Sequence, residues 1–185
     1  MIYVVGGPPR CGKTELAVRL CRDHGLPFIS TDAIWGVAEV ALPHMAVPMA
    51  KGADRIPAAA ELFLPFLDRL VDRLCTAAPD YLVEGELVRP RDVVRIATRH
   101  PTRSVFLIRS RPTVHALSEP PGLHPWLQTQ PPETAEAVAE EVRAYSGKLA
   151  AECQEQGFPC IEVGDRFETA MREAARALGI EAKSG

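Results

Sequence analysis

The sequence contains no asparagine, and only four of its 21 lysine and arginine residues are lysines. Regulatory GTPases read guanine with an Asn-Lys-x-Asp element, which this chain cannot form. A protein-kinase catalytic loop also needs an asparagine for its second Mg²⁺, so that class is excluded as well. The Asp-x-x-Gly switch of GTPases is absent too.

The sequence also has little net charge, no long apolar run and no paired cysteine motif, and these absences indicate where the protein is located and what it binds. The net charge is −3, so no basic surplus indicates nucleic-acid or membrane-surface binding. No apolar run approaches the roughly 18 residues of a membrane helix, and no basic stretch precedes an apolar one at the N-terminus. The five cysteines have no CxxC spacing, which is typical of a reducing compartment. We expect a cytoplasmic protein with no nucleic-acid or membrane partner.

Short apolar runs alternate with longer stretches of helical periodicity, which indicates an α/β fold with a largely parallel sheet. We expect strands at 2–5, 26–29, 81–83, 104–108 and 159–163. Helices are predicted at 13–24, around 92–98, over roughly 20 residues after 133 and at the end of the chain, and 118–133 is predicted to be a loop. A longer helix should begin near Pro57, with Pro65 kinking or dividing it. At 185 residues, the chain is predicted to be a single domain, 1–185.

One motif is specific. Residues 7–14 match G-x-x-x-x-G-K-[ST], a phosphate-binding loop, between an apolar strand and an amphipathic helix. Glycines allow the backbone to approach an anion closely, and successive N–H groups and the helix N-terminus attract phosphate. We expect the nucleotide to be bound by the whole loop: Gly7, Pro8, Pro9, Arg10, Cys11, Gly12, Lys13 and Thr14.

Positions within the loop have different expected roles. The two prolines lack an N–H, so the amides must come mainly from Arg10 through Thr14. Lys13 should reach the β/γ-phosphates, and the Thr14 hydroxyl is placed for Mg²⁺. The helix N-terminus and Lys13 should lower the pKa of Cys11, which would make it sensitive to oxidation and protected by nucleotide.

The chain resembles the small-molecule kinases built like adenylate kinase, among them shikimate kinase, chloramphenicol phosphotransferase, the zeta toxins and 2-phosphoglycerate kinase. The resemblance rests on the loop at 7–14, on Ile29-Ser30-Thr31-Asp32 and on Val83-Glu84-Gly85. It implies a P-loop three-layer sandwich with a five-stranded parallel sheet in the order 2-3-1-4-5. It also implies an acceptor-binding insert at 33–79 and a lid at 112–135.

Two carboxylates and an arginine are candidates for the reaction centre. In the resembling kinases an acid at the position of Asp32 accepts the proton of the substrate hydroxyl or orients it; alternatively, this turn only caps the next helix. Glu84 is expected to hold Mg²⁺ or the acceptor, unless it is a surface acid at a strand end. Arg89, which follows Glu84-Gly85, is predicted to contact the substrate.

The lid and the acceptor pocket are predicted less directly. Arg109, Arg111 and Arg143 are candidates for stabilising the transferred phosphoryl group, although any of them could be a solvated surface side chain. Trp35, three residues after Asp32, is expected to line the acceptor site, while Phe63 fits a core position.

Together these features predict a kinase that uses ATP and Mg²⁺ to phosphorylate a hydroxyl of a small molecule, working as a monomer or homodimer. One alternative is a nucleoside monophosphate kinase, whose acceptor is a phosphate. Another is a nucleotide-binding regulator without significant transfer. A coupled ADP assay with candidate acceptors separates the three.

Overall fold

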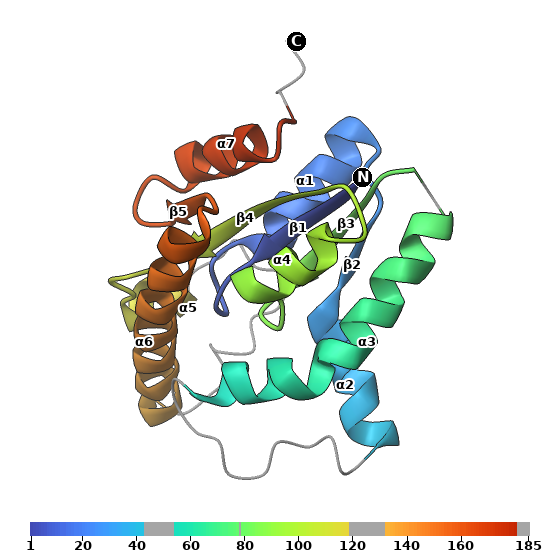
Figure 1. Ribbon diagram of the computed structural model, residues 1–185. Helices are drawn as coiled ribbons and strands as arrows, with labels where there is room; N and C mark the ends of the chain where they lie inside the picture. Colours follow the sequence, from blue (N-terminus) through green and yellow to red (C-terminus); the bar gives the residue numbers. More distant parts are fainter. Residues whose placement is uncertain (43–53, 78, 119–131, 181–185) are drawn as a thin grey trace.

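A computed structural model describes residues 1–42, 54–77, 79–118 and 132–180, and shows one sheet between layers of helices (Figure 1). The elements follow one another as β1 (Ile2–Gly6), α1 (Lys13–His24), β2 (Phe28–Ser30), α2 (Thr31–Ala41), α3 (Arg55–Ala77), β3 (Tyr81–Gly85), α4 (Pro90–Ala97), β4 (Thr102–Ile108), α5 (Val114–Ser118), α6 (Pro132–Gln156), β5 (Cys160–Glu162) and α7 (Phe167–Ala177).

The sheet has five strands in the order β2-β3-β1-β4-β5, and every pairing is parallel. This confirms the α/β class and the strand order that the resemblance implied. The predicted strands are present, with β5 shorter than expected. The short helix α5 was not predicted, and most of the predicted loop at 118–133 lies outside the described residues.

Helices cover both faces of the sheet, and the strands alternate between the two layers. In β1, Ile2 and Val4 pack with α3 and α4, whereas Val5 packs with α1 and α7. In β4, Phe106 belongs to the first layer and Leu107 to the second. Strands that bury both faces are typical of parallel sheets between helices.

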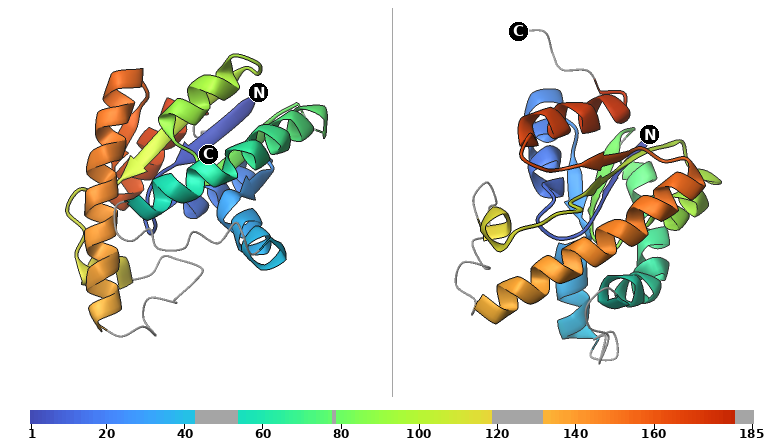
Figure 2. Two further views of the ribbon diagram at one scale, coloured as in Figure 1. Left: turned by 60° about the horizontal axis from the view of Figure 1, so that its bottom comes forward. Right: turned by 90° about the vertical axis from the view of Figure 1, so that its left-hand side faces the viewer.

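The longest helices frame the edge of the sheet where the strands end. α3 is a single helix of 23 residues with Pro65 inside it, and it bends along its course (Figure 1). The prediction of a kink or a break is thus met by a bend, because proline removes one backbone hydrogen bond without ending the helix. α6 lies beside the end of β4 and beside β5 (Figure 2). Among the helices of the described ranges, none has the length and hydrophobicity needed to cross a membrane.

Pairing in register brings the carboxyl ends of β1, β2 and β3 to the same edge. Gly6 is opposite Gly85, and Ser30 is opposite Glu84. The segments that follow these three strands therefore meet there, which is the usual position of ligands in open α/β sheets.

Candidate active site

The loop between β1 and α1 has backbone geometry that its glycines make possible. Gly7 has φ +147°, and a Cβ there would lie 2.2 Å from the Leu107 carbonyl oxygen. Gly12 has φ +85° and caps the N-terminus of α1. Arg10 has φ 63°, a left-handed conformation that is uncommon for a residue other than glycine. A side chain at Gly7 would not fit, so the close packing of the loop against β4 requires the glycine that the sequence motif specifies.

Lys13 turns back across this loop. Its Nζ donates a hydrogen bond to the Pro8 carbonyl oxygen at 2.9 Å, and the side chain is buried. Burial lowers the pKa of Lys13, but nearby carboxylates outweigh that effect and hold the pKa above its ordinary value; they belong mainly to Asp32, Glu84 and Glu86. The ammonium is therefore charged and lies at the opening of a backbone anion site.

Thr14 and Glu84 meet at the first turn of α1. The Thr14 hydroxyl donates to Glu84 Oε1 at 3.2 Å. The Glu84 side chain is 0% exposed, and within the described residues its Oε2 has no hydrogen-bond partner. Burial raises the pKa of Glu84, while Lys13 acts against the shift. A hydroxyl and a buried carboxylate with an unused oxygen are hard oxygen donors, so the pair fits Mg²⁺.

Asp32 lies in the first turn of α2 and is connected to the end of β3. Its Oδ1 accepts hydrogen bonds from the backbone N–H of Glu86 at 3.1 Å and from the Thr31 hydroxyl at 3.2 Å. Gly85, with φ +151°, permits this approach, because a Cβ there would lie 1.8 Å from Thr31 Oγ1. Ser30, the N-cap residue of α2, makes no side-chain cap hydrogen bond. Asp32 is thus oriented by a neighbouring strand, with its side chain exposed at the mouth of the loop.

Glu86 belongs to this group but was not predicted. Its carboxylate pairs with Arg55 at the start of α3, at 3.3 Å, and Arg55 also pairs with Glu141 of α6 at 2.7 Å. Burial and Asp32 raise the pKa of Glu86, and Arg55 lowers it. The signal available in the sequence was the position of Glu86, directly after Glu84-Gly85. Glu141 gave no such signal, since it follows another glutamate on an ordinary helical pattern.

Two predicted arginines lie close together beside the phosphate loop. Arg10 Nε donates to the Leu117 carbonyl oxygen at 2.7 Å, and Arg109 Nη1 donates to that of Ala116 at 3.1 Å. Burial, together with Arg109, lowers the pKa of Arg10. The Nε of Arg109 is buried without a hydrogen-bond partner in the described part of the chain. These contacts place Arg109 next to the loop.

The other predicted arginines are exposed or bound in ion pairs. Arg111 is exposed. Arg143, on α6, is exposed and pairs with Glu140. The Arg89 guanidinium is 2% exposed and binds the carboxylates of Asp92 and Glu61, at 2.8 and 2.6 Å.

Trp35 stands at the margin of the core. It is half-buried, and its ring meets that of Phe63 edge-on at 6.2 Å; Phe63 in turn stacks on Phe66. Phe63 is fully buried, in agreement with a core position. Trp35 follows Asp32 by one helical turn and is only partly covered by the core. Most of the predicted lid, and residues 43–53 of the predicted insert, lie outside the described residues.

The predicted lowering of the Cys11 pKa is wrong. Burial raises its pKa to about 12, and Lys13 offsets only part of the increase. The thiol packs in the apolar layer with Val5 and Leu16. Its side chain faces the core although its backbone belongs to the phosphate loop, so desolvation of a thiolate outweighs the attraction of the ammonium.

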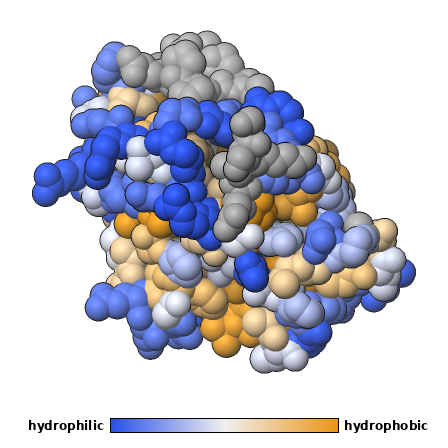
Figure 3. Space-filling model, turned by 90° about the horizontal axis from the view of Figure 1, so that it is seen from above, coloured by the Kyte–Doolittle hydropathy of each residue, from blue (hydrophilic) through white to orange (hydrophobic). Residues whose placement is uncertain are grey.

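A cavity of about 730 Å³ lies elsewhere, between α1 and α7. It is lined by apolar side chains such as Leu20 and Met171 and by charged ones such as Arg19 and Arg176, and it includes no residue of the phosphate loop. Figure 3 shows the molecule from above, with hydrophobic residues at the surface among hydrophilic ones.

No protein-family model and no curated protein sequence matches the chain. Its structure is similar to a gluconokinase from Sinorhizobium meliloti 1021, with a TM-score of 0.56 and 17% identity over 98% of this chain and 93% of the other. A shikimate kinase from Bacteroides thetaiotaomicron gives a TM-score of 0.60 at 16% identity, over 97% and 98% of the two chains. A shikimate kinase from Acinetobacter baumannii, in complex with shikimate, gives 0.55 at 16% identity, over 98% and 95%. The chain thus has the fold of the P-loop small-molecule kinases.

Proposed function

We propose that the protein is a kinase that uses ATP and Mg²⁺ to phosphorylate a hydroxyl group of a small molecule. The observation that carries the proposal is the arrangement at the ends of β1, β2 and β3. A complete phosphate loop with its buried lysine faces an oriented carboxylate, Asp32, and the Thr14–Glu84 pair lies with them. The fold that the chain shares with a gluconokinase and shikimate kinases supports the same activity.

The donor half of the site would be formed by the loop and α1. The amides from Arg10 to Thr14 and the N-terminus of α1 bind the phosphates of ATP. Lys13 exchanges its hydrogen bond with Pro8 for one with a phosphate oxygen. Thr14 and Glu84 would hold Mg²⁺, which neutralises charge on the phosphates when bound. Arg109, already beside the loop, is the arginine best placed to offset charge that develops during transfer.

The acceptor half would be centred on Asp32. Its carboxylate is exposed, and the contacts with Thr31 and the Glu86 N–H hold its orientation. Asp32 would accept a hydrogen bond from the acceptor hydroxyl and remove its proton as the phosphoryl group is transferred, a role that needs an approach of about 3 Å. Trp35, one turn later on α2, would line the same pocket.

Two observations weigh against a phosphate acceptor. The acceptor side carries the carboxylates of Asp32 and Glu86, which repel a nucleoside monophosphate. Arg89, the arginine after Glu84-Gly85, gives its guanidinium to Asp92 and Glu61. A hydroxyl acceptor is therefore the better match.

The test is a coupled assay of ADP formation from ATP over a panel of sugars, hydroxy acids, antibiotics and nucleoside monophosphates. We expect transfer to a hydroxyl compound, with kcat reduced by at least about 100-fold in both Lys13→Ala and Asp32→Asn. Thermal unfolding of each variant serves as the control for folding. Full activity in both variants would refute the proposal. Stabilisation by nucleotide without ADP formation would favour the regulator instead.

A further inference from the structure

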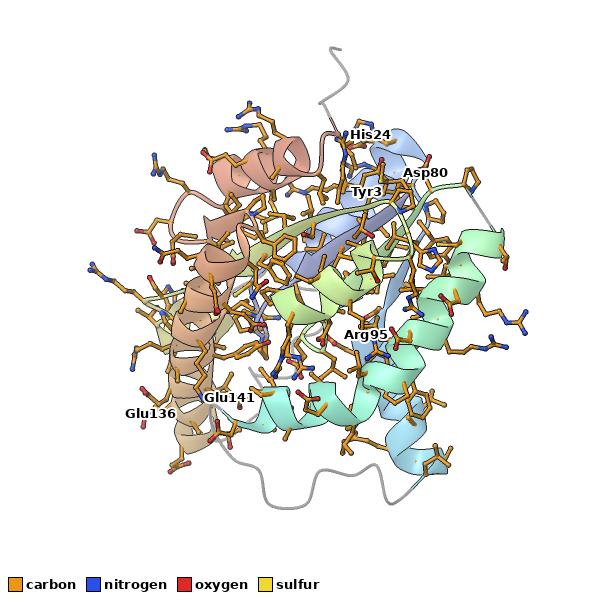
Figure 4. All side chains as sticks on the ribbon, viewed as in Figure 1. Tyr3, His24, Asp80, Arg95, Glu136 and Glu141 are labelled. Atoms are coloured by element: carbon orange, nitrogen blue, oxygen red, sulfur yellow. The ribbon has the colours of Figure 1, made fainter. Side chains whose placement is uncertain are left out.

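Arg55, at the start of α3, forms ion pairs with two carboxylates. Arg55 lies between Glu86, which follows β3, and Glu141 on α6; its Nη2 is 3.3 Å from Glu86 Oε1, and its Nε is 2.7 Å from Glu141 Oε1. Both carboxylates are largely buried, whereas the arginine is partly exposed. In Figure 4, Glu141 lies on the side of α6 that faces α3, while Glu136 points away from it.

This trio is continuous with the reaction centre. The backbone N–H of Glu86 binds Asp32 Oδ1 at 3.1 Å, and the Glu86 carboxylate lies within electrostatic reach of Asp32, Lys13 and Glu141. An acceptor whose hydroxyl meets Asp32 would therefore place its remaining groups near Arg55 and its two partners.

The charges around Asp32 and Arg55, where the acceptor is expected to bind, do not balance. On the acceptor side, Asp32, Glu86 and Glu141 supply three carboxylates, and Arg55 supplies one guanidinium. Lys13 is directed to the phosphate loop, and Arg55 is neutralised by its two partners. Glu84 does not enter this balance, because it lies against Thr14 and is assigned with it to Mg²⁺. A negative group on the substrate would be repelled, and a positive one attracted.

We infer that the acceptor is a hydroxyl-bearing amine, such as an amino alcohol or amino sugar, and that Glu86 and Glu141 are specificity-determining residues that select it against carboxylates by neutralising Arg55. The inference rests on the proposed kinase function. It identifies the charge of the substrate, which the phosphate loop does not determine.

The experiment uses two matched sets of compounds. One set is D-gluconate, D-glucitol and 1-amino-1-deoxy-D-glucitol, and the other is D-glucuronate, D-glucose and D-glucosamine. Within each set the skeleton is similar, and the charge changes from negative through neutral to positive. We expect kcat/KM for ADP formation to rise in that order, with at least about a tenfold difference between the amine and the carboxylate.

Variants test the assigned residues. Glu86→Gln keeps the N–H that binds Asp32 but removes one charge from Arg55, and Glu141→Gln removes the other. Each should reduce the preference for the amine by several-fold, mainly through KM. Glu136→Gln is the matched control, because Glu136 is an exposed glutamate on the same helix that faces away from α3 (Figure 4). It should leave the preference unchanged.

The two proposals fail in different ways. A carboxylate or neutral member preferred over its amine, or a preference that both glutamine variants leave intact, overturns the inference about charge. ADP formation that depends on Lys13 upholds the kinase whichever member is preferred. If ADP that depends on Lys13 forms only with uncharged or acidic compounds of the wider panel, the inference about charge fails and the kinase stands.

Discussion

Arg89 offers a direct test of whether a residue next to the site acts through binding or through folding. Its guanidinium donates to both oxygens of Asp92, each at 2.8 Å, and its backbone N–H donates to Asp92 Oδ2 at 3.0 Å. The backbone bond satisfies the N–H of the N-cap residue Arg89 at the start of α4, which is one half of a capping box. Burial lowers the pKa of Arg89, but the hydrogen bonds that it donates to Asp92 and Glu61 more than compensate and raise it.

The expected cost differs strongly between the two acidic partners. Arg89 and Asp92 are 2% and 3% exposed, and removing one member of such a buried pair costs about 3 to 5 kcal/mol. Glu61 is 55% exposed, and an ion pair at such a site contributes about 0 to 1 kcal/mol. For a chain of this size, 1 kcal/mol corresponds to a change in Tm of about 2 to 4 °C. We therefore expect Arg89→Met and Asp92→Asn to lower Tm by about 6 to 20 °C, and Glu61→Gln by less than about 4 °C.

The assay is thermal unfolding followed by circular dichroism, combined with ADP formation on the best acceptor below the Tm of every variant. A structural role predicts that Asp92→Asn is much less stable than Glu61→Gln, with KM unchanged in the folded fraction. Equal Tm values for these two variants would refute the reasoning. A higher KM in Arg89→Met at an unchanged Tm would instead support the sequence-based prediction that Arg89 contacts the substrate.

Three further predictions concern the site itself. Iodoacetamide should label exposed Cys75 but not Cys11 in the native protein at pH 8, with or without ATP, because burial raises the pKa of Cys11 to about 12. Labelling of Cys11, detected by mass spectrometry, would contradict this. Burial raises the pKa of Glu84 above its ordinary value of 4.5, so the folded state binds the carboxyl proton more tightly than the unfolded state does. The contribution of Glu84 to the free energy of unfolding therefore falls as pH rises above 4.5. Glu84→Gln should raise Tm at pH 8 more than at pH 4, and reduce the stabilisation by ATP that depends on Mg²⁺; an identical Tm–pH profile would contradict this. Gly85→Ala should reduce kcat by about tenfold or more by displacing Thr31, which a Cβ would approach to 1.8 Å, and unchanged kinetics would count against the close approach.

The features that could be predicted from the sequence are those determined by neighbouring residues or by regular periodicity. The phosphate loop is one, because Gly7 and Gly12 meet conformational demands within a few residues of Lys13. The alternation of β1 between two apolar layers is another, since each strand residue faces one side or the other. Glu84 lies at the end of β3 and Asp32 two residues after β2, and parallel pairing brings the two strand ends to one edge.

The features that the sequence did not show depend on which surface a side chain packs against in the folded protein. For Cys11, the sequence showed the nearby ammonium and the helix N-terminus but not the apolar layer that surrounds the thiol. For Arg89, the position after Glu84-Gly85 indicated a contact with the substrate, which stays a prediction, but it did not show that Asp92, three residues later, is a buried partner of the guanidinium. Local electrostatics was visible in both cases, and burial was not.

The two halves of the candidate site consequently differ in how the chain encodes them. Most groups for the phosphate donor lie in one continuous segment, residues 7–14, with Glu84 and Arg109 added from the ends of β3 and β4, so few substitutions in that segment can be tolerated without loss of the loop. Groups around Arg55 come from α3, the end of β3 and α6, which meet only in the folded protein. Replacing Glu86 or Glu141 would alter the charge presented to an acceptor while leaving Lys13 and Thr14 in place. A fold of this kind can therefore change its acceptor through a few distant side chains and keep the same phosphoryl donor, which is why the sequence alone indicates the donor more clearly than the acceptor.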